Sequence, residues 1–333
     1  MRRNIFDARW IGPHGIGRFA LELKRRLLEL ESIKLGGRPS GPLDPFILAG
    51  YLSVIRPDVF FSPGYNAPFG RPCPFVFCIH DLNHLVIQEN SSALKRRYYR
   101  HILLPAVHKA RSLLTVSEFS RQAIAEWAGI DCAKVVNVSN GISAAFSPHG
   151  AVYQGSSRPY FLYVGNHRPH KNIRRLLRAY AACGLRGEVA LVSTGRPNDG
   201  LQHEIESLRL SEDVSFVGEV TDDQLAELYR GALGLVLVSL YEGFGLPIVE
   251  AMACGTPVLA SSVASMPEVA GGAALLVDPL DEDAIADGLV RLAMDSRLRE
   301  QLRSYGLLRA CDFSWEGTAQ KVQNALLTAV EEG

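Results

Sequence analysis

The sequence has no long apolar run and few cysteines. No uninterrupted apolar stretch approaches the roughly 18 residues that a membrane-spanning helix needs. The first residues, MRRNIFDARW, lack the apolar segment of a signal peptide. Six cysteines are scattered over 333 residues, and none forms a Cys-x-x-Cys pair. This composition argues against a disulfide scaffold, and it predicts buried free thiols in a protein that stays in the cytoplasm.

The sequence also lacks a net charge, but the two halves differ. Residues 1–150 hold 19 Lys+Arg and 11 Asp+Glu, and residues 151–333 hold 16 and 24. Hydrophobic residues make up 47% and charged residues 21%, as in ordinary globular enzymes. A chain of this length predicts two domains. The basic first half predicts an anionic partner, for which lipid and nucleic acid are both candidates.

Short apolar segments alternate with helical patterns in both halves. This alternation predicts parallel sheets covered on both faces, in two successive α/β domains. Residues 31–53 are rich in Gly and Pro and predict no regular element, while residues 147–159 (SPHGAVYQGSSRP) predict the linker. The expected strands are 4–8, 58–62, 75–79, 113–116 and 135–138, then 160–164, 189–192, 214–217, 234–238 and 258–260. The expected helices are 18–30, 173–183, 201–208 and 222–232, with others starting at 247 and 281.

The most informative stretch is SLYEGFGLPIVEAMACGTPVLAS, residues 239–261. A buried strand leads into a glycine loop, and Pro247 stands where a helix would start. Glu242 lies on the loop, and Glu250 is expected in the first helical turn. A glycine loop before a helix amino terminus is a site for an anion such as pyrophosphate. A capping glutamate beside an ordinary tight turn is the alternative interpretation.

This string closely resembles the signature of the family 4 retaining glycosyltransferases. The resemblance implies the GT-B fold, in which two Rossmann-like domains with parallel sheets face each other across a cleft. It implies an acceptor-binding domain at 1–150, a nucleotide-sugar-binding domain at 151–312, and a last helix at 313–333 that crosses back to the first domain. Glu242 would act in catalysis and Glu250 would bind the ribose. The other donor-binding residues would be Gly243, Phe244, Gly245, Leu246 and Pro247.

Residues 163–172, YVGNHRPHKN, match the same family's loop after the first strand of the second domain. By that resemblance Arg168 and Lys171 bind the donor pyrophosphate, and Asn166 lies in the donor site. Two cations after a strand suit this role, because they neutralise charge on a departing diphosphate. A solvated basic loop is the alternative for any Arg-x-x-Lys alone.

In the first half, GPHGIGR (residues 12–18) resembles the family's glycine loop over the donor phosphates and includes Gly15 and Gly17. The string GIGRFA also fits a dinucleotide-binding fingerprint, but no ribose-binding acid follows a second strand. By resemblance His80 acts in catalysis near the transferred sugar, and a core histidine is the alternative interpretation. Asp81 and Ser117 are expected on the acceptor side.

The resemblance implies retention of the anomeric configuration by front-face attack, without a cofactor or metal ion. No carboxylate pair is evident for a double displacement. The only Asp-x-Asp, residues 281–283, predicts a helix cap, and no His/Cys group has zinc spacing.

Within the family, residues 239–261 together with FSWEGTA look most like enzymes that use GDP-mannose. Donors based on dTDP-rhamnose, UDP-glucose and UDP-N-acetylglucosamine stay open. The acceptor is expected to be a glycan or a lipid-pyrophosphate-linked saccharide of a surface polysaccharide or glycolipid. Two rival hypotheses are a sugar-nucleotide epimerase or NAD-dependent enzyme on a similar scaffold, and a non-catalytic glycan-binding subunit.

Two basic runs lie in the first half, at Arg2, Arg3 and Lys24–Arg26 and at residues 95–101, KRRYYRH. They predict peripheral contact with anionic lipid at the inner face of the cytoplasmic membrane. Solvated helix faces are the alternative. No nucleic-acid-binding module is evident.

Overall fold

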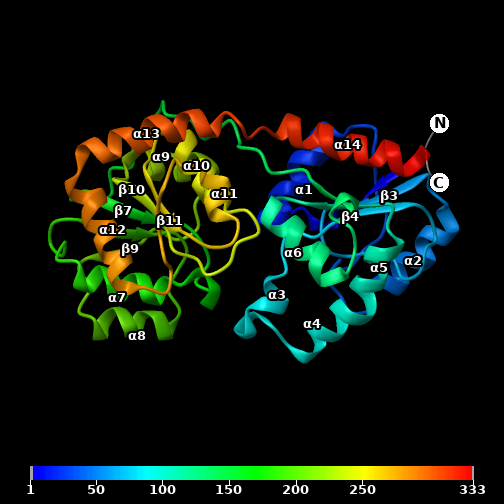
Figure 1. The fold of residues 1–333 in the computed structure, drawn as a ribbon, viewed down its shortest axis with the longest axis horizontal. Coiled ribbons are helices and arrows are strands. Elements are labelled where there is room, and N and C mark those ends of the chain that lie inside the picture. Colours follow the sequence, from blue (N-terminus) through cyan, green and yellow to red (C-terminus); the bar gives the residue numbers. More distant parts are fainter. Residues whose placement is uncertain (1–2, 332–333) are drawn as a thin grey trace. The chain divides into compact units, whose positions relative to one another are not determined.

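A computed structural model describes residues 3–331 of the chain. The chain divides into two compact units. Unit 1 comprises the residues up to 141 and those from 314 onward, and unit 2 comprises residues 142–313. Each unit contains a parallel six-stranded sheet with helices on both faces, as the strand and helix alternation predicts (Figure 1).

The sheet of unit 1 has the strand order β2-β1-β3-β4-β5-β6. Its strands are β1 (Asn4–Phe6), β2 (Glu31–Ser32), β3 (Val59–Ser62), β4 (Phe75–Cys78), β5 (Ser112–Thr115) and β6 (Val135–Asn137). One core joins the sheet to the helices α2 (Asp44–Ile55), α5 (Leu104–Lys109) and α6 (Glu118–Ala128). The helices α1 (Gly15–Arg26) and α14 (Trp315–Glu331) contact each other, and α14 packs on β3, β4 and β5.

Short segments complete unit 1 between β1 and α1 and between β4 and α5. They are η1 (Ala8–Trp10), α3 (Asn83–Val86), η2 (Gln88–Asn90), α4 (Ala93–Tyr98) and the π-helical turn η3 (Tyr99–Leu103). The 3-10 turn η4 (Cys132–Lys134) precedes β6.

The sheet of unit 2 has the strand order β12-β11-β10-β7-β8-β9. Its strands are β7 (Tyr160–Tyr163), β8 (Ala190–Ser193), β9 (Val214–Phe216), β10 (Gly234–Leu237), β11 (Val258–Ser261) and β12 (Leu275–Val277). Its helices are η5 (Pro169–Lys171), α7 (Ile173–Ala182), α8 (Asp199–Ser207), α9 (Asp222–Gly231), α10 (Leu246–Ala253), α11 (Met266–Ala270), α12 (Glu282–Met294) and α13 (Ser296–Ala310). This order is the doubly wound Rossmann arrangement. The strands β7 to β9 are added toward one edge of the sheet and β10 to β12 toward the other, so the strand order reverses between β7 and β10.

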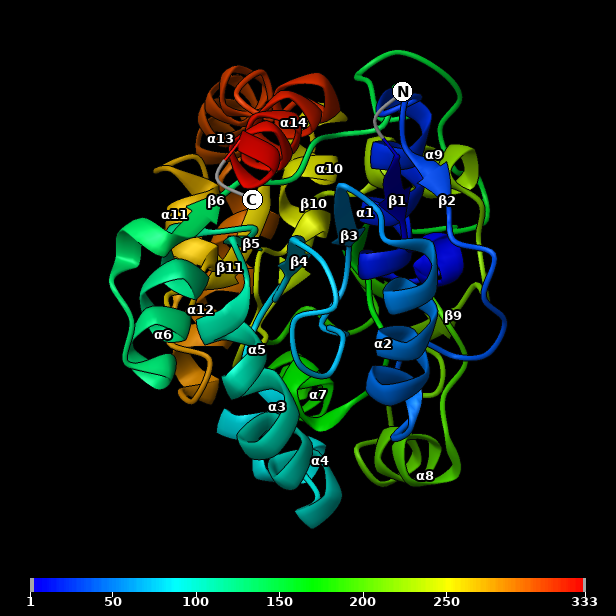
Figure 2. The ribbon, with the colours of Figure 1, turned by 90° about the vertical axis from the view of Figure 1, so that its right-hand side faces the viewer.

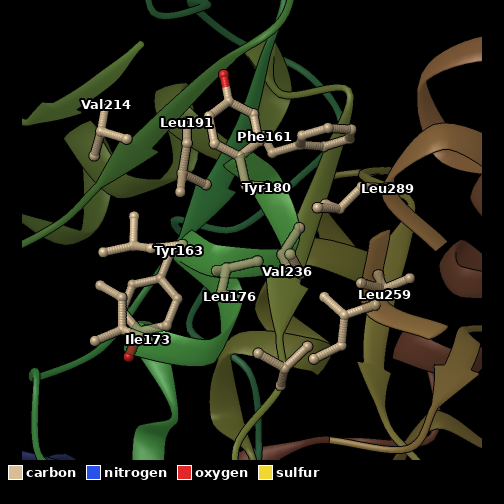
Figure 3. Close-up of a cluster of buried hydrophobic side chains, with 14 of the residues drawn as sticks. Phe161, Tyr163, Ile173, Leu176, Tyr180, Leu191, Val214, Val236, Leu259 and Leu289 are labelled. Atoms are coloured by element: carbon tan, nitrogen blue, oxygen red, sulfur yellow. The ribbon is translucent and has the colours of Figure 1, made fainter. Parts of the chain in front are cut away.

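The core of unit 2 lies between its sheet and the helices α7, α8 and α12. Figure 3 shows Phe161, Leu191 and Val236 from the strands packed with Leu176 and Leu289 from the helices. All five side chains are buried. Burial on both faces explains why these strands are continuous apolar runs in the sequence.

Residues 31–53 were expected to form no regular element, and this prediction is wrong. They contain β2 and most of α2, the blue helix labelled in Figure 2. The helix α2 escaped prediction because its sequence, DPFILAGYLSVI, is apolar on every side and has no helical period. Its ends are nevertheless recognisable: Pro45 lies in the first turn, and Arg56 ends the helix in the left-handed conformation.

The predicted linker, residues 147–159, belongs to unit 2. The Tyr153 amide donates to the Glu227 carbonyl, and the Arg230 side chain donates to the carbonyls of Ser147 and Ala151. The chain instead passes between the units at residues 141–142 and 313–314. A Pro, Gly and Ser cluster marks irregular backbone, and here that backbone is held against α9.

The cysteines and the Asp281 cap can be compared with the structure directly. Cys73, Cys78 and Cys254 are buried free thiols as predicted, but Cys132 and Cys183 are only half-buried and Cys311 is exposed. The Asp281 carboxylate accepts from the amides of Asp283 and Ala284 at the start of α12, which confirms the predicted cap. Within residues 3–331, no helix is long and apolar enough to cross a membrane.

Candidate active site

The candidate donor site of unit 2 lies at the carboxyl ends of β7 and β10, where the strand order reverses. In open parallel sheets, ligands bind at such a switch point, because the loops after the two strands run in opposite directions and leave a crevice. The loop after β7 carries Arg168 and Lys171, and the loop after β10 carries Glu242. Two of the sequence motifs therefore meet at one place in the sheet.

Lys171 and Glu242 form an ion pair across these two loops. The Lys171 Nζ lies 2.6 Å from Glu242 Oε1, and the side chains are only 14% and 12% exposed. Partial burial strengthens such a pair, because little water screens it. The partners are 71 positions apart in the sequence, so sequence analysis could not predict this contact.

Hydrogen bonds fix the two loops to each other. The Leu240 amide donates to the His170 carbonyl at 2.7 Å, and the Asn172 side-chain amide donates to the Val238 carbonyl at 2.9 Å. Asn172 adopts a left-handed conformation with φ of 60°, which asparagine tolerates better than most residues. The Ser265 hydroxyl lies 2.9 Å from the Glu242 carbonyl. The site is thus held before any ligand binds.

The other cation of the motif, Arg168, is exposed, and no hydrogen bond or ion pair of its side chain is found among the described residues. Its amide donates to the Asn166 side chain at 3.3 Å. His170, which lies between Arg168 and Lys171 in the sequence, is buried. Burial is the main cause that lowers the pKa of His170 to about 4. The Glu242 charge acts to raise this pKa, whereas the Lys171 and Arg168 charges lower it further. A neutral imidazole therefore lies beside the ion pair at pH 7.

The glycine loop after β10 leads directly into α10. Gly245 occupies the N-cap position with φ of +93°, where a side chain would be strained, and Pro247 lies in the first turn. Glu250 was expected in the first helical turn, but it lies in the second, because the helix starts at Leu246. Its carboxylate is buried and accepts a hydrogen bond from the Tyr229 hydroxyl at 3.1 Å.

In unit 1 the glycine loop after β1 forms the start of α1. Its His14 side chain caps the helix by accepting from the Gly17 amide at 2.9 Å. A Cβ added at Gly17 would lie 2.1 Å from the Gly12 carbonyl, so only glycine fits there. A Cβ at Gly15 would meet no atom within 4 Å. The close approach of Gly12 to α1 therefore requires glycine at position 17, whereas the space beside Gly15 is open.

His80 follows β4 in unit 1. Its Nε2 lies 2.8 Å from the Pro63 carbonyl, so this nitrogen carries the proton, and its own carbonyl accepts from the Ser120 hydroxyl. Burial lowers the pKa of His80 to about 4. The Phe19 ring packs edge-on against the imidazole, with ring centroids 4.9 Å apart. His80 is therefore neutral and fixed in one orientation.

The two expected acceptor-side residues make local hydrogen bonds. The Asp81 carboxylate accepts from the Asn83 amide at 2.9 Å. The Ser117 hydroxyl is the N-cap of α6 and accepts from the Ser120 amide at 3.0 Å. Both contacts shape the loops after β4 and β5, at the same edge of the sheet as His80.

Sequence analysis missed several residues that support the site. Tyr229 lies on α9 and contacts Glu250 across 21 residues, and Ser265 reaches back to the loop of Glu242. No local pattern marks either residue. His170 could have been found, since it lies inside the quoted loop motif next to Lys171.

Together these features define a class of protein. Two doubly wound parallel sheets, with a paired lysine and glutamate beside a glycine-capped helix at a switch point, are typical of enzymes that bind a nucleotide diphosphate. No group of three or more His, Cys, Asp or Glu side chains placed to hold a metal ion occurs in the described part of the chain.

Comparison with known proteins identifies the class more closely. A family model described as Glycosyl transferases group 1 matches residues 153–309, and one described as Glycosyltransferase Family 4 matches residues 1–146. The O-antigen chain mannosyltransferase B of Escherichia coli is 33% identical over 322 residues, which are 93% of this chain and 82% of that protein. The chain belongs to the family 4 glycosyltransferases.

Two further relatives agree with this assignment. The O-antigen chain mannosyltransferase RfbU of Salmonella typhimurium is 32% identical over 206 residues, which are 61% of this chain and 56% of that protein. The solved structure of WaaG, a glycosyltransferase involved in lipopolysaccharide biosynthesis, matches with a TM-score of 0.78 and 16% identity, over 96% of this chain and 98% of that one. The expected α/β class and GT-B fold are thereby confirmed, as is the expectation of a glycosyltransferase.

Proposed function

We propose that this glycosyltransferase transfers mannose from GDP-mannose, with retention of configuration, to a glycan or lipid-linked saccharide acceptor during synthesis of a surface polysaccharide or glycolipid. The observation that carries the proposal is the Lys171–Glu242 pair at the switch point of unit 2, beside the start of α10. The mannosyltransferase names of two relatives support mannose as the sugar.

Each charged group has a role in this proposal. The diphosphate of the donor would lie against the α10 amino terminus, Arg168 and Lys171, where positive charge balances it. Glu242 would exchange part of its contact with Lys171 for a hydroxyl of the sugar. Glu250, oriented by Tyr229, would accept from the ribose hydroxyls. Unit 2 thus supplies the donor site, and unit 1 supplies the acceptor side.

In the proposed front-face route, the bond from the anomeric carbon to the diphosphate oxygen breaks on the face that the acceptor attacks. The departing diphosphate takes the proton of the acceptor hydroxyl. Lys171, Arg168 and the α10 dipole stabilise the leaving diphosphate, because its charge is largest in the transition state. The neutral imidazole of His80 and its carbonyl would face the transferred sugar.

A donor comparison tests the sugar and the base. The full chain is incubated with GDP-mannose, UDP-glucose, UDP-N-acetylglucosamine or dTDP-rhamnose, and thermal stabilisation and donor turnover are measured for each. We expect the largest effects with GDP-mannose, and a larger stabilisation by GDP than by UDP. A preference for another donor would overturn the mannose assignment and leave the donor site in place.

The rival hypothesis, that the chain is an NAD-dependent enzyme, is tested by the same thermal measurement with NAD. In the structure β2 ends at Ser32 and is followed by Ile33 and Lys34. Glu31, the one carboxylate in β2, lies 3.6 Å from Arg3 Nε, so it is paired with a cation instead of being placed to accept from a ribose. We expect no stabilisation by NAD, and stabilisation equal to that by GDP would favour the rival.

We further propose that unit 1 contacts an anionic membrane through α2 and α4. The helix α2 exposes three large apolar side chains, its N-cap residue Leu43 exposes a fourth, and the ring of Phe69 packs on one of them, Phe46. The exposed residues of this apolar patch are Leu43, Phe46, Ile47, Val54 and Phe69. An apolar patch of this kind marks an interaction surface, since most soluble surfaces avoid one.

A second group of exposed side chains lies on α4 and the turn η3 that follows it. The Tyr98 hydroxyl at the end of α4 donates to the Tyr65 carbonyl, and the pKa of Tyr98 is raised mainly by burial and also by Asp44 at the start of α2. The side chains of Arg96, Arg97, Arg100 and His101 are exposed. Exposed apolar groups and exposed arginines on one unit suit the negative surface of the cytoplasmic leaflet.

The other basic run does not support this contact. Arg25 and Arg26 pair with Glu22, and Arg26 also pairs with Glu316. Lys24 donates to the Leu30 carbonyl. Arg2 lies outside the described residues. The membrane proposal therefore rests on residues 95–101 and on the apolar patch.

Flotation with phosphatidylglycerol vesicles tests this contact. We expect the full chain to float with the vesicles at low salt, and the paired variant Phe46→Ser with Ile47→Ser to float several-fold less. The matched control is Leu308→Ser, which removes an even more exposed leucine from α13 in unit 2. Failure of the unmodified chain to bind the vesicles would sink the proposal, as would equal loss in the control.

A further inference from the structure

Unit 2 has a second polar pocket, at the opposite edge of its sheet from Lys171 and Glu242. Its volume is about 850 Å³, a size typical of small-molecule sites. It is formed by residues that precede β7, β8 and β9, namely Ser157, Arg158, Arg186, Gly187, Arg209, Ser211, Glu212 and Asp213. All six strands of the sheet are parallel, so this is the amino-terminal edge. The pocket is therefore separate from the candidate donor site.

The pocket gathers positive charge in a unit that is acidic as a whole. Residues 142–313 hold 15 Lys+Arg and 21 Asp+Glu. Arg158, Arg186 and Arg209 nevertheless come together from three separate loops, in a lining that also includes Glu212 and Asp213. An excess of guanidinium groups in one concave place attracts anions more strongly than the same charges spread over the surface.

Asp213 holds two of the arginines in place. Its carboxylate lies 2.9 Å from Arg158 Nη1 and 3.4 Å from Arg186 Nε, and it accepts from the Gly187 amide at 2.9 Å. Arg158 also donates to the Glu212 carbonyl, and Arg186 donates to the Arg209 carbonyl. A guanidinium carries five N–H donors, and these contacts occupy two on each arginine. The remaining donors are held in a fixed orientation.

Arg209 is a third cation in an unusual backbone conformation. It follows the end of α8 with φ of 55°, where helices usually place glycine. Its side chain is exposed, and no hydrogen bond or ion pair of that side chain is found within the described chain. A non-glycine residue there costs the fold about 1 kcal/mol or more. Stability alone would thus favour glycine over arginine at this position.

We propose that this pocket binds a phosphate-bearing ligand. Arginine forks match phosphate oxygens in a bidentate manner, and here two forks are oriented by one carboxylate while a third remains free to close on the ligand. The hydroxyls of Ser157 and Ser211 add uncharged hydrogen-bonding groups. The phosphate group could belong to a free phosphorylated metabolite or to a lipid headgroup, because both present the same oxygens.

Inorganic pyrophosphate serves as the probe, and the full chain carries Arg168→Ala and Lys171→Ala so that the candidate donor site does not compete. Calorimetric titration at low salt is expected to show one bound pyrophosphate in this background. Adding Arg209→Gly should lower the affinity tenfold or more. The same change should leave the thermal stability of the unliganded chain unchanged or higher, because glycine suits the backbone at this position.

The matched control is Arg297→Ala, which removes an exposed arginine from α13 of the same unit. We expect it to leave pyrophosphate binding unchanged. Absence of binding in the background chain would overturn the proposal, and so would equal affinity after Arg209→Gly. An equal loss with Arg297→Ala would show unspecific attraction and would overturn it too.

Two more measurements distinguish the two possible sources of the phosphate group and keep the test of this pocket independent of the test of the donor site. Binding of glycerol 3-phosphate that depends on Arg209 indicates a free metabolite, whereas Arg209-dependent flotation with phosphatidylglycerol vesicles alone indicates a headgroup. GDP binding to the parent chain is titrated separately. Its absence would contradict the donor site without affecting the arginine pocket.

Discussion

At the scale of single residues, Lys171 is the most informative position. It is the only lysine between residues 142 and 313, and its one described ion pair joins the loops after β7 and β10. A lysine that stabilises a leaving diphosphate contributes mostly in the transition state, so its removal should lower kcat more than it raises KM.

We therefore expect Lys171→Ala to lower kcat about a hundredfold or more, with the fold intact. Turnover is measured with the preferred donor, and the fold is checked by circular dichroism and thermal unfolding. The control Arg297→Ala removes a cation of the same unit and should keep full turnover. Near-normal turnover in Lys171→Ala would refute the role of this lysine.

The buried histidines lead to a prediction about pH. The pKa of His170 is lowered to about 4 in the folded chain, against an ordinary value of about 6.5. The unfolded chain therefore binds more protons than the folded chain between these two values. The contribution of the neutral His170 to the free energy of unfolding is therefore complete above pH 6.5, and it is lost as the pH falls toward 4.

For one such histidine the loss at pH 5 amounts to about 2 kcal/mol. Urea unfolding of the parent chain and of His170→Gln is compared at pH 7.5 and at pH 5.0. We expect the parent to lose more stability on acidification than the variant, by about this amount. An identical pH dependence would contradict a neutral, buried His170.

At the scale of elements, α2 is anchored by buried charges at its start. The Arg9 guanidinium donates to the carboxylates of Asp7 and Asp44, and the Asn66 side-chain amide donates to both carboxylates at 3.0 Å. The Trp10 indole donates to the Asn66 oxygen at 2.6 Å. This polar network ties the first turn of α2 to the carboxyl ends of β1 and β3.

Removing the only cation of this network should therefore be costly. We expect Arg9→Met to lower the free energy of unfolding by about 3–5 kcal/mol, because Asp7 and Asp44 remain buried without a counterion. Denaturant unfolding measures the loss, and hydrogen exchange should show α2 amides exchanging faster. The control Arg121→Met breaks a more exposed pair with Glu118 and should leave stability nearly unchanged.

The helix α2 also illustrates which parts of the fold could not be predicted from the sequence. Ten of the twelve strands within residues 3–331 were predicted, because buried parallel strands are short apolar runs between turn signals, whereas the short edge strands β2 and β12 were missed. The loops of Lys171 and Glu242 were predictable too, since their motifs are local. The helix α2 was missed because it lacks a polar face, and Tyr229 was missed because its contact with Glu250 depends on how α9 packs against α10. Contacts set by packing leave no local pattern.

At the scale of the whole molecule, the two units differ in how the chain builds them. Unit 2 is one continuous stretch with its own core, whereas unit 1 needs two distant stretches. The helix α14 supplies to unit 1 the buried side chains of Trp315, Val322 and Leu326 and covers strands β3, β4 and β5. Each large buried side chain contributes about 1.5–3 kcal/mol, and typical domain stabilities are only about 5–15 kcal/mol.

Three pieces of the chain test this division. We expect residues 142–313 to unfold cooperatively when produced alone, because no buried contact of its core is removed. Residues 1–141 alone should lack a cooperative transition, since losing α14 exposes the apolar face of β3 to β5. Placing residues 314–333 before residues 1–141 through a flexible linker should restore that transition, because it returns the helix to the same piece. Circular dichroism during heating measures all three. A cooperative transition of residues 1–141 at the same temperature as the restored piece would show that α14 is dispensable for unit 1.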